Sequence, residues 1–323
     1  MGRRRLVVMA LAVAAVLAGC ARGSVPATGP TTRPGTLTAP AAPGPSGYSA
    51  SLVSGGLTRT YLVYLPAAAR SGRPLPLLLS LHGRLGTGAG QARLTNFDAV
   101  ANAFGFIVVS PDGYQRSWAD GRGTSPADKA GVNDVAFLGA LLDQVMARNR
   151  VDPTRVYVAG MSNGGFMAER LGCDLASRFA AIAVVAANFD QGLAARCAPA
   201  HPLPVILIHG SNDPLVPEAG GLLEGEPILS TLATVSRWAS LAGCGAAPAV
   251  ASLPVLVNDG TSVQRSTYTG CHNGARVVYD DVIGGGHAWP DGEQYLPVAV
   301  IGKTSRNLNA SEVIWQFCLG YHL

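Results

Sequence analysis

The chain has 323 residues, of which 48% are hydrophobic and 14% are charged, and its formal net charge is +4. This composition is typical of a protein with a large core and excludes a chain that is disordered throughout. A predicted leader at the N-terminus contains three of the arginines, and its removal leaves 21 Lys and Arg against 20 Asp and Glu. The mature protein would then have a net charge of about +1, which argues against a nucleic-acid partner.

The first 20 residues resemble a bacterial lipoprotein signal. Arg3–Arg5 form a positive end, and the apolar run Leu6–Gly19 has 14 residues, too few for a membrane span of roughly 20. Leu17–Cys20 is similar to a lipobox, which predicts lipidation of Cys20. The alternatives are an ordinary signal peptide and, less favoured, a twin-arginine export signal. We therefore expect an extracytoplasmic protein that is lipid-anchored to the cell membrane or secreted.

Residues 21–47 contain six prolines among Gly, Ser, Thr and Ala. No stretch there can bury a core, so we predict a disordered tether. The pattern changes at Tyr48, and we expect one catalytic domain over residues 48–323. We expect the domain to be monomeric and to contact the membrane only through its N-terminal lipid.

Six cysteines favour an oxidising compartment. With Cys20 assigned to the anchor, five remain, and an odd number leaves one thiol unpaired. We predict the disulfides Cys173–Cys197 and Cys244–Cys271, with Cys318 free. The alternative is that some of these cysteines are simply small buried hydrophobic residues.

Strand and helix patterns alternate along the domain, which predicts a mostly parallel central sheet with helices on both faces, an α/β fold. The alternating segments Tyr48–Val53 and Thr60–Leu65 indicate an antiparallel hairpin. The further strands expected are Leu75–Leu81, Phe106–Ser110, Arg155–Ala159, Ala181–Ala186, Val205–Ile208 and Arg276–Val282, and the helices are Asn96–Phe104, Asp134–Arg148, Phe166–Leu171 and Ser311–Leu319.

The segment Gly160–Gly164 has the pattern G-x-S-x-G, the nucleophile elbow of α/β-hydrolases. It lies between a predicted strand and a predicted helix, where the chain must turn so sharply that Ser162 adopts a strained backbone. A side chain at either glycine would collide with neighbouring backbone. The turn would expose the Ser162 hydroxyl as a nucleophile and aim the backbone N–H of Asn163 at a developing oxyanion.

A serine nucleophile needs a base and an acid, which follow it along the chain in this fold. His287 follows the last predicted strand through three glycines, so it is the expected base. Asp213 follows the strand that ends at Ile208 and is the expected acid, with Asp190 as its rival. Asp112 and Asp134 precede the serine, and Asp134 is expected to cap its helix or to pin a neighbouring loop.

A second oxyanion donor is expected in the loop after Leu75–Leu81, from the backbone N–H of Arg84. Whether the Arg84 side chain enters the site is left open. The aromatic residues Tyr114, Trp118 and Trp289 follow predicted loops and could line an acyl pocket or pack behind it. The sequence has neither a metal-binding nor a nucleotide-binding motif, so we expect no metal and no cofactor.

Six motifs occur in a fixed order along the domain, namely Leu81–Gly83, Ser110–Gly113, Val132–Leu138, Gly160–Gly165, His209–Asp213 and Gly284–Pro290. Together they resemble secreted α/β-hydrolase esterases of the polyhydroxybutyrate depolymerase, feruloyl esterase and acetylxylan esterase group. The resemblance covers about Tyr48 to the C-terminus and implies the α/β-hydrolase fold, the triad Ser162, Asp213 and His287, and the same two disulfides.

The resulting hypothesis is a serine carboxylic-ester hydrolase that forms an acyl-enzyme. Its substrates would be small esters, feruloyl or acetyl esters linked to polysaccharide, or hydroxyalkanoate esters. The alternatives are a peptidase or acyltransferase with the same fold, and a surface binding protein without catalysis.

Overall fold

A computed structural model describes residues 46–245 and 247–323. The predicted leader and Cys20 lie outside the described residues, as does the predicted tether up to residue 45. The domain begins two residues before the predicted boundary, because Ser46 and Gly47 belong to β1 (Ser46–Ser54), where they pair with Leu65 and Tyr64.

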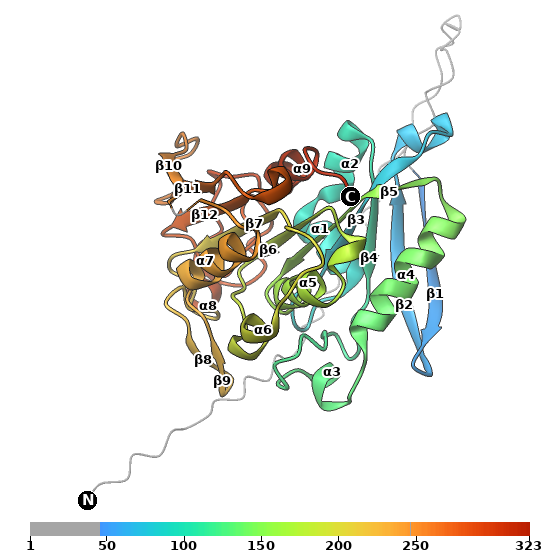
Figure 1. The fold of residues 1–323 in the computed structure, drawn as a ribbon, viewed down its shortest axis with the longest axis horizontal. Coiled ribbons are helices and arrows are strands. Elements are labelled where there is room, and N and C mark those ends of the chain that lie inside the picture. Colours follow the sequence, from blue (N-terminus) through green and yellow to red (C-terminus); the bar gives the residue numbers. More distant parts are fainter. Residues whose placement is uncertain (1–45, 246) are drawn as a thin grey trace, which may run out of the picture. The chain divides into compact units, whose positions relative to one another are not determined.

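Ten of the described strands form one sheet in the order β1-β2-β4-β3-β5-β6-β7-β12-β11-β10 (Figure 1). The six strands from β4 to β12 are mutually parallel, and an antiparallel pair extends the sheet at each edge. This arrangement confirms the predicted fold class. The carboxyl ends of all six parallel strands meet at one edge, where ligands bind in open α/β sheets.

The apolar runs of the sequence become the central strands because both faces of a parallel sheet are covered. All seven residues of β3 are buried, as are all five of β6. The remaining strands are β2 (Leu57–Leu65), β3 (Leu75–Leu81), β4 (Ile107–Pro111), β5 (Val151–Met161), β6 (Ala181–Val185), β7 (Val205–Gly210), β8 (Gly221–Leu223), β9 (Glu226–Ile228), β10 (Ala249–Ser252), β11 (Ser262–Tyr268) and β12 (Val277–Ile283).

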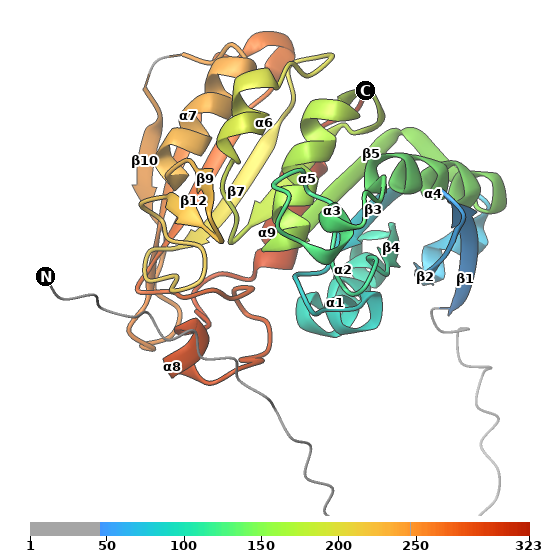
Figure 2. The same ribbon diagram turned by 90° about the horizontal axis from the view of Figure 1, so that it is seen from below.

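Helices cover both faces of the sheet (Figure 2). The helices α4, α5, α6 and α7 pack on one face, where Phe137, Phe166 and Trp238 enter a single large core. The helices α2 and α9 cover the other face, and Trp315 of α9 stacks on Phe106 there.

All of the expected helices and strands are present, each with bounds within a few residues of the prediction. The α-helices are α1 (Gly88–Thr95), α2 (Phe97–Phe104), α3 (Pro126–Lys129), α4 (Asp134–Arg148), α5 (Asn163–Asp174), α6 (Gln191–Arg196), α7 (Thr231–Leu241), α8 (Val298–Ile301) and α9 (Ala310–Cys318). Among the described helices, none is both long enough and apolar enough to cross a membrane.

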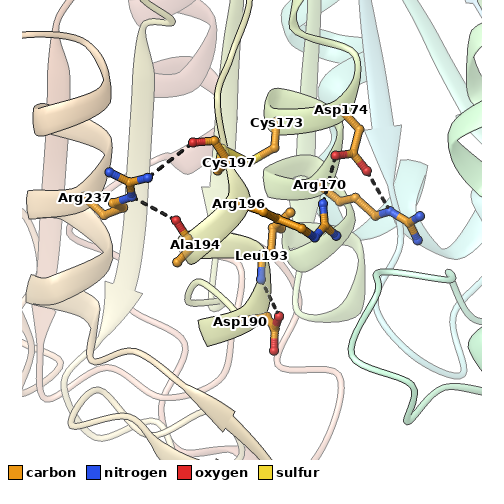
Figure 3. The surroundings of a disulfide bond; sticks show 9 residues. All are labelled: Arg170, Cys173, Asp174, Asp190, Leu193, Ala194, Arg196, Cys197 and Arg237. Carbon is orange, nitrogen blue, oxygen red and sulfur yellow. Dashed lines mark hydrogen bonds and ion pairs between the residues drawn. A yellow bond between two sulfur atoms is a disulfide. The ribbon is translucent and has the colours of Figure 1, made fainter.

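Both predicted disulfides are confirmed, and Cys318 is a free, buried thiol. The first disulfide joins Cys173, near the end of α5, to Cys197, the residue after α6 (Figure 3). Arg237 of α7 donates hydrogen bonds to the carbonyl oxygens of Ala194 and Cys197. The helix that begins beside Ser162 is therefore fastened at its far end to the neighbouring helices.

Candidate active site

Ser162 lies at the turn between β5 and α5, with backbone angles of φ 55° and ψ −123°. Such a conformation is costly for a residue with a side chain and persists only where the surroundings enforce it. Two backbone hydrogen bonds do so, because Ser162 N–H donates to Val185 O of β6 and its carbonyl accepts from Phe166 N–H, both at 2.9 Å.

At the two glycines of the elbow, neighbouring backbone segments come so close that a side chain at either position would collide with them. A Cβ atom on Gly160 would lie 2.0 Å from the carbonyl oxygen of Gly164, and one on Gly164 would lie 2.3 Å from that of Leu81. The collisions expected from the sequence are therefore present, and they bring β3, β5 and α5 together at the serine.

Asp213 and His287 come from the ends of neighbouring parallel strands, β7 and β12. The Nδ1 atom of His287 lies 2.7 Å from Oδ2 of Asp213, although 74 residues separate them. The other oxygen of Asp213, Oδ1, accepts hydrogen bonds from the backbone N–H groups of Leu215 and Val216, both at 2.8 Å. Two such donors fix the orientation of the carboxylate.

The rival carboxylates have other roles. Asp190 is the N-cap of α6 and accepts from Leu193 N–H at 2.7 Å. Asp134 forms a buried ion pair with Arg59 at 2.8 Å and accepts from Ala119 N–H at 2.8 Å. Asp134 therefore pins a neighbouring loop, whereas the cap of α4 is Asn133.

Ser162 and His287 line one cavity with a volume of about 690 Å³. Among the described residues, the Ser162 hydroxyl has no hydrogen-bond partner, and no hydrogen bond joins it to His287. The lining is mainly apolar and carries a few charged side chains at its edges. Its apolar members are Leu85, Leu94, Met161, Phe166, Leu215, Val216, Leu223, Tyr295 and Leu296.

The two expected oxyanion donors belong to residues that border this cavity. Asn163 is the first residue of α5, and Arg84 follows β3 by three residues. Within the part of the chain that the structure describes, neither backbone N–H has a protein acceptor. Unpaired N–H groups at such a position suit a developing negative charge, which the N-terminus of α5 also favours.

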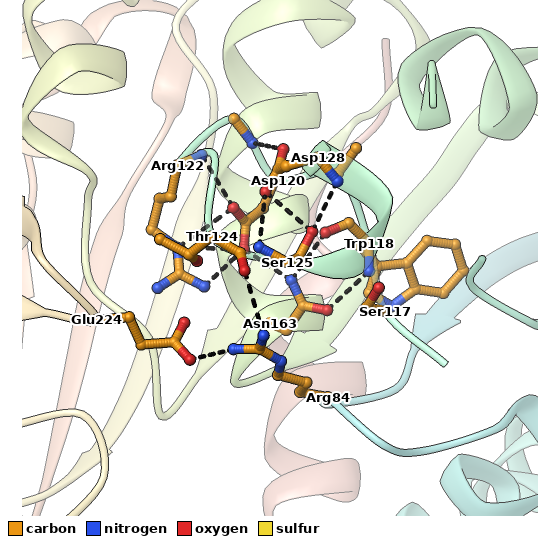
Figure 4. A network of polar contacts seen from close by, with 12 residues as sticks. Arg84, Ser117, Trp118, Asp120, Arg122, Thr124, Ser125, Asp128, Asn163 and Glu224 are labelled. Atoms are coloured by element: carbon orange, nitrogen blue, oxygen red, sulfur yellow. Dashed lines mark hydrogen bonds and ion pairs between the residues drawn. The ribbon is translucent and has the colours of Figure 1, made fainter. Parts of the chain in front are cut away.

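The side chain of Asn163 is held in a buried polar network that the sequence did not reveal (Figure 4). Its amide accepts from Trp118 N–H at 2.7 Å and donates to Trp118 O at 3.0 Å and to Asp120 at 2.7 Å. Asp120 also pairs with Arg122, whose guanidinium lies over the ring of Phe166. Burial raises the pKa of Asp120, and Arg122 opposes that shift.

The Arg84 side chain borders the cavity and forms an ion pair with Glu224, at the tip of the β8–β9 hairpin (Figure 4). It also donates to the carbonyl oxygen of Thr124 at 3.2 Å. This side chain therefore joins three loops above the sheet edge, a contact that connects distant segments and has no sequence signature.

The three aromatic residues proposed for an acyl pocket do not line the cavity. Trp118 and Trp289 are fully buried, and their indole N–H groups donate to His82 O and Ser311 Oγ. Tyr114 is half-buried in a turn that closes against Ser117. Of the two alternatives for Trp118 and Trp289, packing behind the cavity is therefore the one observed. Phe166 and Tyr295 border the cavity instead.

Within residues 46–245 and 247–323, no group of three or more His, Cys, Asp or Glu side chains could hold a metal ion. The arrangement at the sheet edge is thus one of a hydroxyl, an imidazole, a carboxylate and backbone N–H groups.

Comparisons with known proteins show the family to which the chain belongs. Residues 59–198 match the family described as "Esterase PHB depolymerase". A protein of Nocardia uniformis subsp. tsuyamanensis named "Putative esterase NocK" is 32% identical over 83% of this chain and 81% of its own length. Feruloyl esterase C of Emericella nidulans is 29% identical over 71% of this chain and 76% of its own.

Two further proteins extend these similarities. Feruloyl esterase B of Piromyces equi is 29% identical over 73% of this chain. The match covers only 44% of that longer protein. The acetyl xylan esterase of Aspergillus awamori has a TM-score of 0.54 at 15% identity, covering 75% of this chain and 94% of its own, and so supports the fold alone. The chain therefore belongs to the esterase PHB depolymerase family and is a carboxylic ester hydrolase with the α/β-hydrolase fold.

Proposed function

We propose that the protein is a serine esterase in which Ser162, His287 and Asp213 form the catalytic triad. The observation that supports this most strongly is the 2.7 Å contact of His287 with Asp213 beside a cavity that contains the Ser162 hydroxyl. An imidazole whose Nδ1–H is bound to a carboxylate has its Nε2 free to accept a proton.

In the proposed reaction, Ser162 Oγ attacks the ester carbonyl carbon and His287 Nε2 takes the hydroxyl proton. The carbonyl oxygen becomes an oxyanion, which the N–H groups of Asn163 and Arg84 bind. The intermediate then expels the alcohol, which leaves with the proton from His287. Water, deprotonated by His287, attacks the acyl-enzyme and releases the acid and free Ser162.

The cavity supports an uncharged acyl group of moderate size. Its volume of about 690 Å³ exceeds what an acetyl group needs, and apolar side chains dominate its walls. We propose aromatic or short aliphatic esters, with feruloyl and acetyl esters as the first candidates because relatives bear those names. An ester panel of graded acyl length and aromaticity tests this, and a rate that is highest for long-chain esters would contradict it.

We also propose that the enzyme acts outside the cytoplasm, anchored through lipidated Cys20 and the tether over residues 21–47, as a monomer. The two disulfides support an oxidising compartment. Metabolic labelling with a fatty acid tests the anchor, since label should be lost in Cys20→Ala. Size-exclusion chromatography of a chain starting at Ser46 tests the monomer.

The experiment that tests the triad is hydrolysis of p-nitrophenyl acetate by Ser162→Ala. We expect turnover to fall by about 10⁶-fold, because no nucleophile remains. The control is Ser51→Ala, which removes an exposed hydroxyl from β1 and should leave the rate unchanged. An unchanged thermal unfolding curve would show that Ser162→Ala is folded. Near-normal turnover by that variant would contradict the proposal.

A further inference from the structure

His82 directly follows β3 and is 1% exposed. Both of its ring nitrogens are engaged. Gly113 N–H donates to Nε2 at 2.9 Å, and Nδ1 lies 2.7 Å from the carbonyl oxygen of Gly83. A backbone N–H can only donate, so Nε2 carries no proton and Nδ1–H is the donor to Gly83. Burial lowers the pKa of His82, which favours this neutral form.

The contact with Gly83 fixes one peptide group. The carbonyl of Gly83 and the N–H of Arg84 belong to the same peptide, and no cis peptide occurs among the described residues. In a trans peptide these two groups point in opposite directions. The Gly83 carbonyl accepts from His82 on one side of the loop and from Gly86 N–H at 2.9 Å. The Arg84 N–H must therefore point away from the imidazole.

The segment that carries this peptide lies beside the nucleophile. A Cβ atom placed on Gly83 would lie 3.4 Å from Cβ of Ser162, so this peptide abuts the serine. The Arg84 N–H has no protein acceptor among the described residues. A donor held unpaired beside a nucleophile is organised before the charge that it binds has formed.

One further residue joins the two donor-bearing segments. The indole of Trp118 donates to His82 O at 2.8 Å, and its ring lies 4.9 Å from the imidazole. The backbone N–H and carbonyl of Trp118 bind the side-chain amide of Asn163 (Figure 4). His82 and Asn163 are thus held against the same buried tryptophan.

We propose that His82 is a positioning residue for the oxyanion hole: its neutral imidazole orients the Gly83–Arg84 peptide so that the Arg84 N–H meets the oxyanion. His82 transfers no proton, because both of its nitrogens are committed to backbone groups. This inference rests on the proposed function of Ser162.

The test compares His82→Asn with His82→Leu, which have nearly the same shape. The amide of asparagine can donate to the Gly83 carbonyl from almost the position of Nδ1, whereas leucine cannot. We expect His82→Leu to lower kcat by about 10²-fold, the effect of losing one oxyanion donor, and His82→Asn to stay within about 10-fold of wild type. KM should change by less than about 3-fold in both.

Two readouts separate positioning from a general loss of structure. The inhibition constant of an aryl trifluoromethyl ketone, whose serine adduct carries an oxyanion, should rise in proportion to the loss in kcat/KM. The acidic limb of the pH–rate profile should keep its midpoint, because His82 transfers no proton in the proposed role. If His82 had a merely structural role, its replacement would lower the amount of active enzyme, and the inhibition constant of the ketone would not rise.

Equal kcat in the asparagine and leucine variants, or a shifted acidic limb, would overturn the inference. Should the leucine variant not fold, His82→Asp replaces it, because a carboxylate of the same shape opposes the Gly83 carbonyl and is expected to lose at least as much activity. Ser162→Ala is measured in the same assays. Its activity tests the proposed triad independently of the His82 variants, so failure of the triad and failure of the positioning role can be distinguished.

Discussion

The loop after β3 and the loop after β12 each place a buried histidine at the same edge of the sheet. His82 is 1% exposed and His287 is 3% exposed, so burial does not distinguish them. Their partners do. Both nitrogens of His82 are bound to backbone groups, whereas His287 binds a carboxylate through Nδ1.

In the proposed mechanism, this difference gives one residue type two roles in the same site. A histidine with a backbone N–H pointed at one nitrogen and a carbonyl at the other is fixed as a neutral hydrogen-bonding bridge. A histidine that is held by a carboxylate through one nitrogen keeps the other nitrogen for proton transfer.

Replacing His287 removes the proton carrier itself. We expect His287→Gln to lower kcat on p-nitrophenyl acetate by about 10⁴–10⁶-fold, far beyond the effect of any His82 variant. Steady-state kinetics on both variants check the ranking. A loss at His82 that equals the loss at His287 would remove the contrast between the two loops.

Replacing Asp213 weakens His287 without removing it. We expect Asp213→Asn to lower kcat by about 10⁴-fold, because the amide favours the wrong imidazole tautomer. The matched control is Asp190→Asn, since asparagine caps a helix as well as aspartate does. That control should keep full activity, and a large loss there would instead favour Asp190 as the acid.

The disulfide at the end of α5 should affect stability rather than chemistry. We expect Cys173→Ala combined with Cys197→Ala to lower the free energy of unfolding by about 2–4 kcal/mol and to leave kcat nearly unchanged at low temperature. Chemical denaturation measures the loss. The pair Cys244 and Cys271 closes a loop of similar length, 27 against 24 residues, and should lose a similar amount.

Asp281 of β12 provides the smallest effect. Burial, with the nearby charge of Glu218, raises its pKa from 3.8 to about 6, and its Oδ1 has no partner among the described residues. The folded protein thus binds more protons than the unfolded chain between these values. Burial of the ionised Asp281 carboxylate therefore lowers the free energy of unfolding above about pH 6. This loss of stability disappears as the pH falls towards 3.8.

Asp281→Asn should therefore stabilise the protein at pH 7.5, by about 1 kcal/mol after allowance for solvent screening of this half-buried group, and not at pH 4. Asp143→Asn, at a carboxylate that is 67% exposed, should change stability by less than about 0.5 kcal/mol at either pH. A stabilisation that grows as the pH falls would contradict the assignment.

The sequence predicted the parallel strands because both faces of each strand are covered, which leaves uninterrupted apolar runs such as Leu75–Leu81. It missed α1, whose segment begins Gly88-Ala89-Gly90 and depends on the Thr87 cap. It also missed β11, where mixed polar residues become a strand only by pairing with β12. Elements stabilised by tertiary contacts leave a weak local pattern.

The residues of the candidate site also fall into those with a local sequence pattern and those that depend on tertiary contacts. Strand ends and chain order located Ser162, Asp213 and His287, because parallel strands deliver their carboxyl ends to one edge. The side chains that support them were not predicted, since the bonds of His82, Trp118 and Asn163 join loops distant in sequence. For Trp118 and Trp289 the sequence left two alternatives open, a place in the cavity wall or packing behind it, because a sequence does not tell which side of a loop an aromatic ring faces; both are buried and neither lines the cavity.

The most direct test of the central claim is labelling with a fluorophosphonate, followed by mass spectrometry of the peptides. The account predicts one phosphonylated residue, Ser162, and no label in Ser162→Ala or after prior unfolding. Labelling of another residue, or no labelling of a folded enzyme that still hydrolyses esters, would contradict the triad.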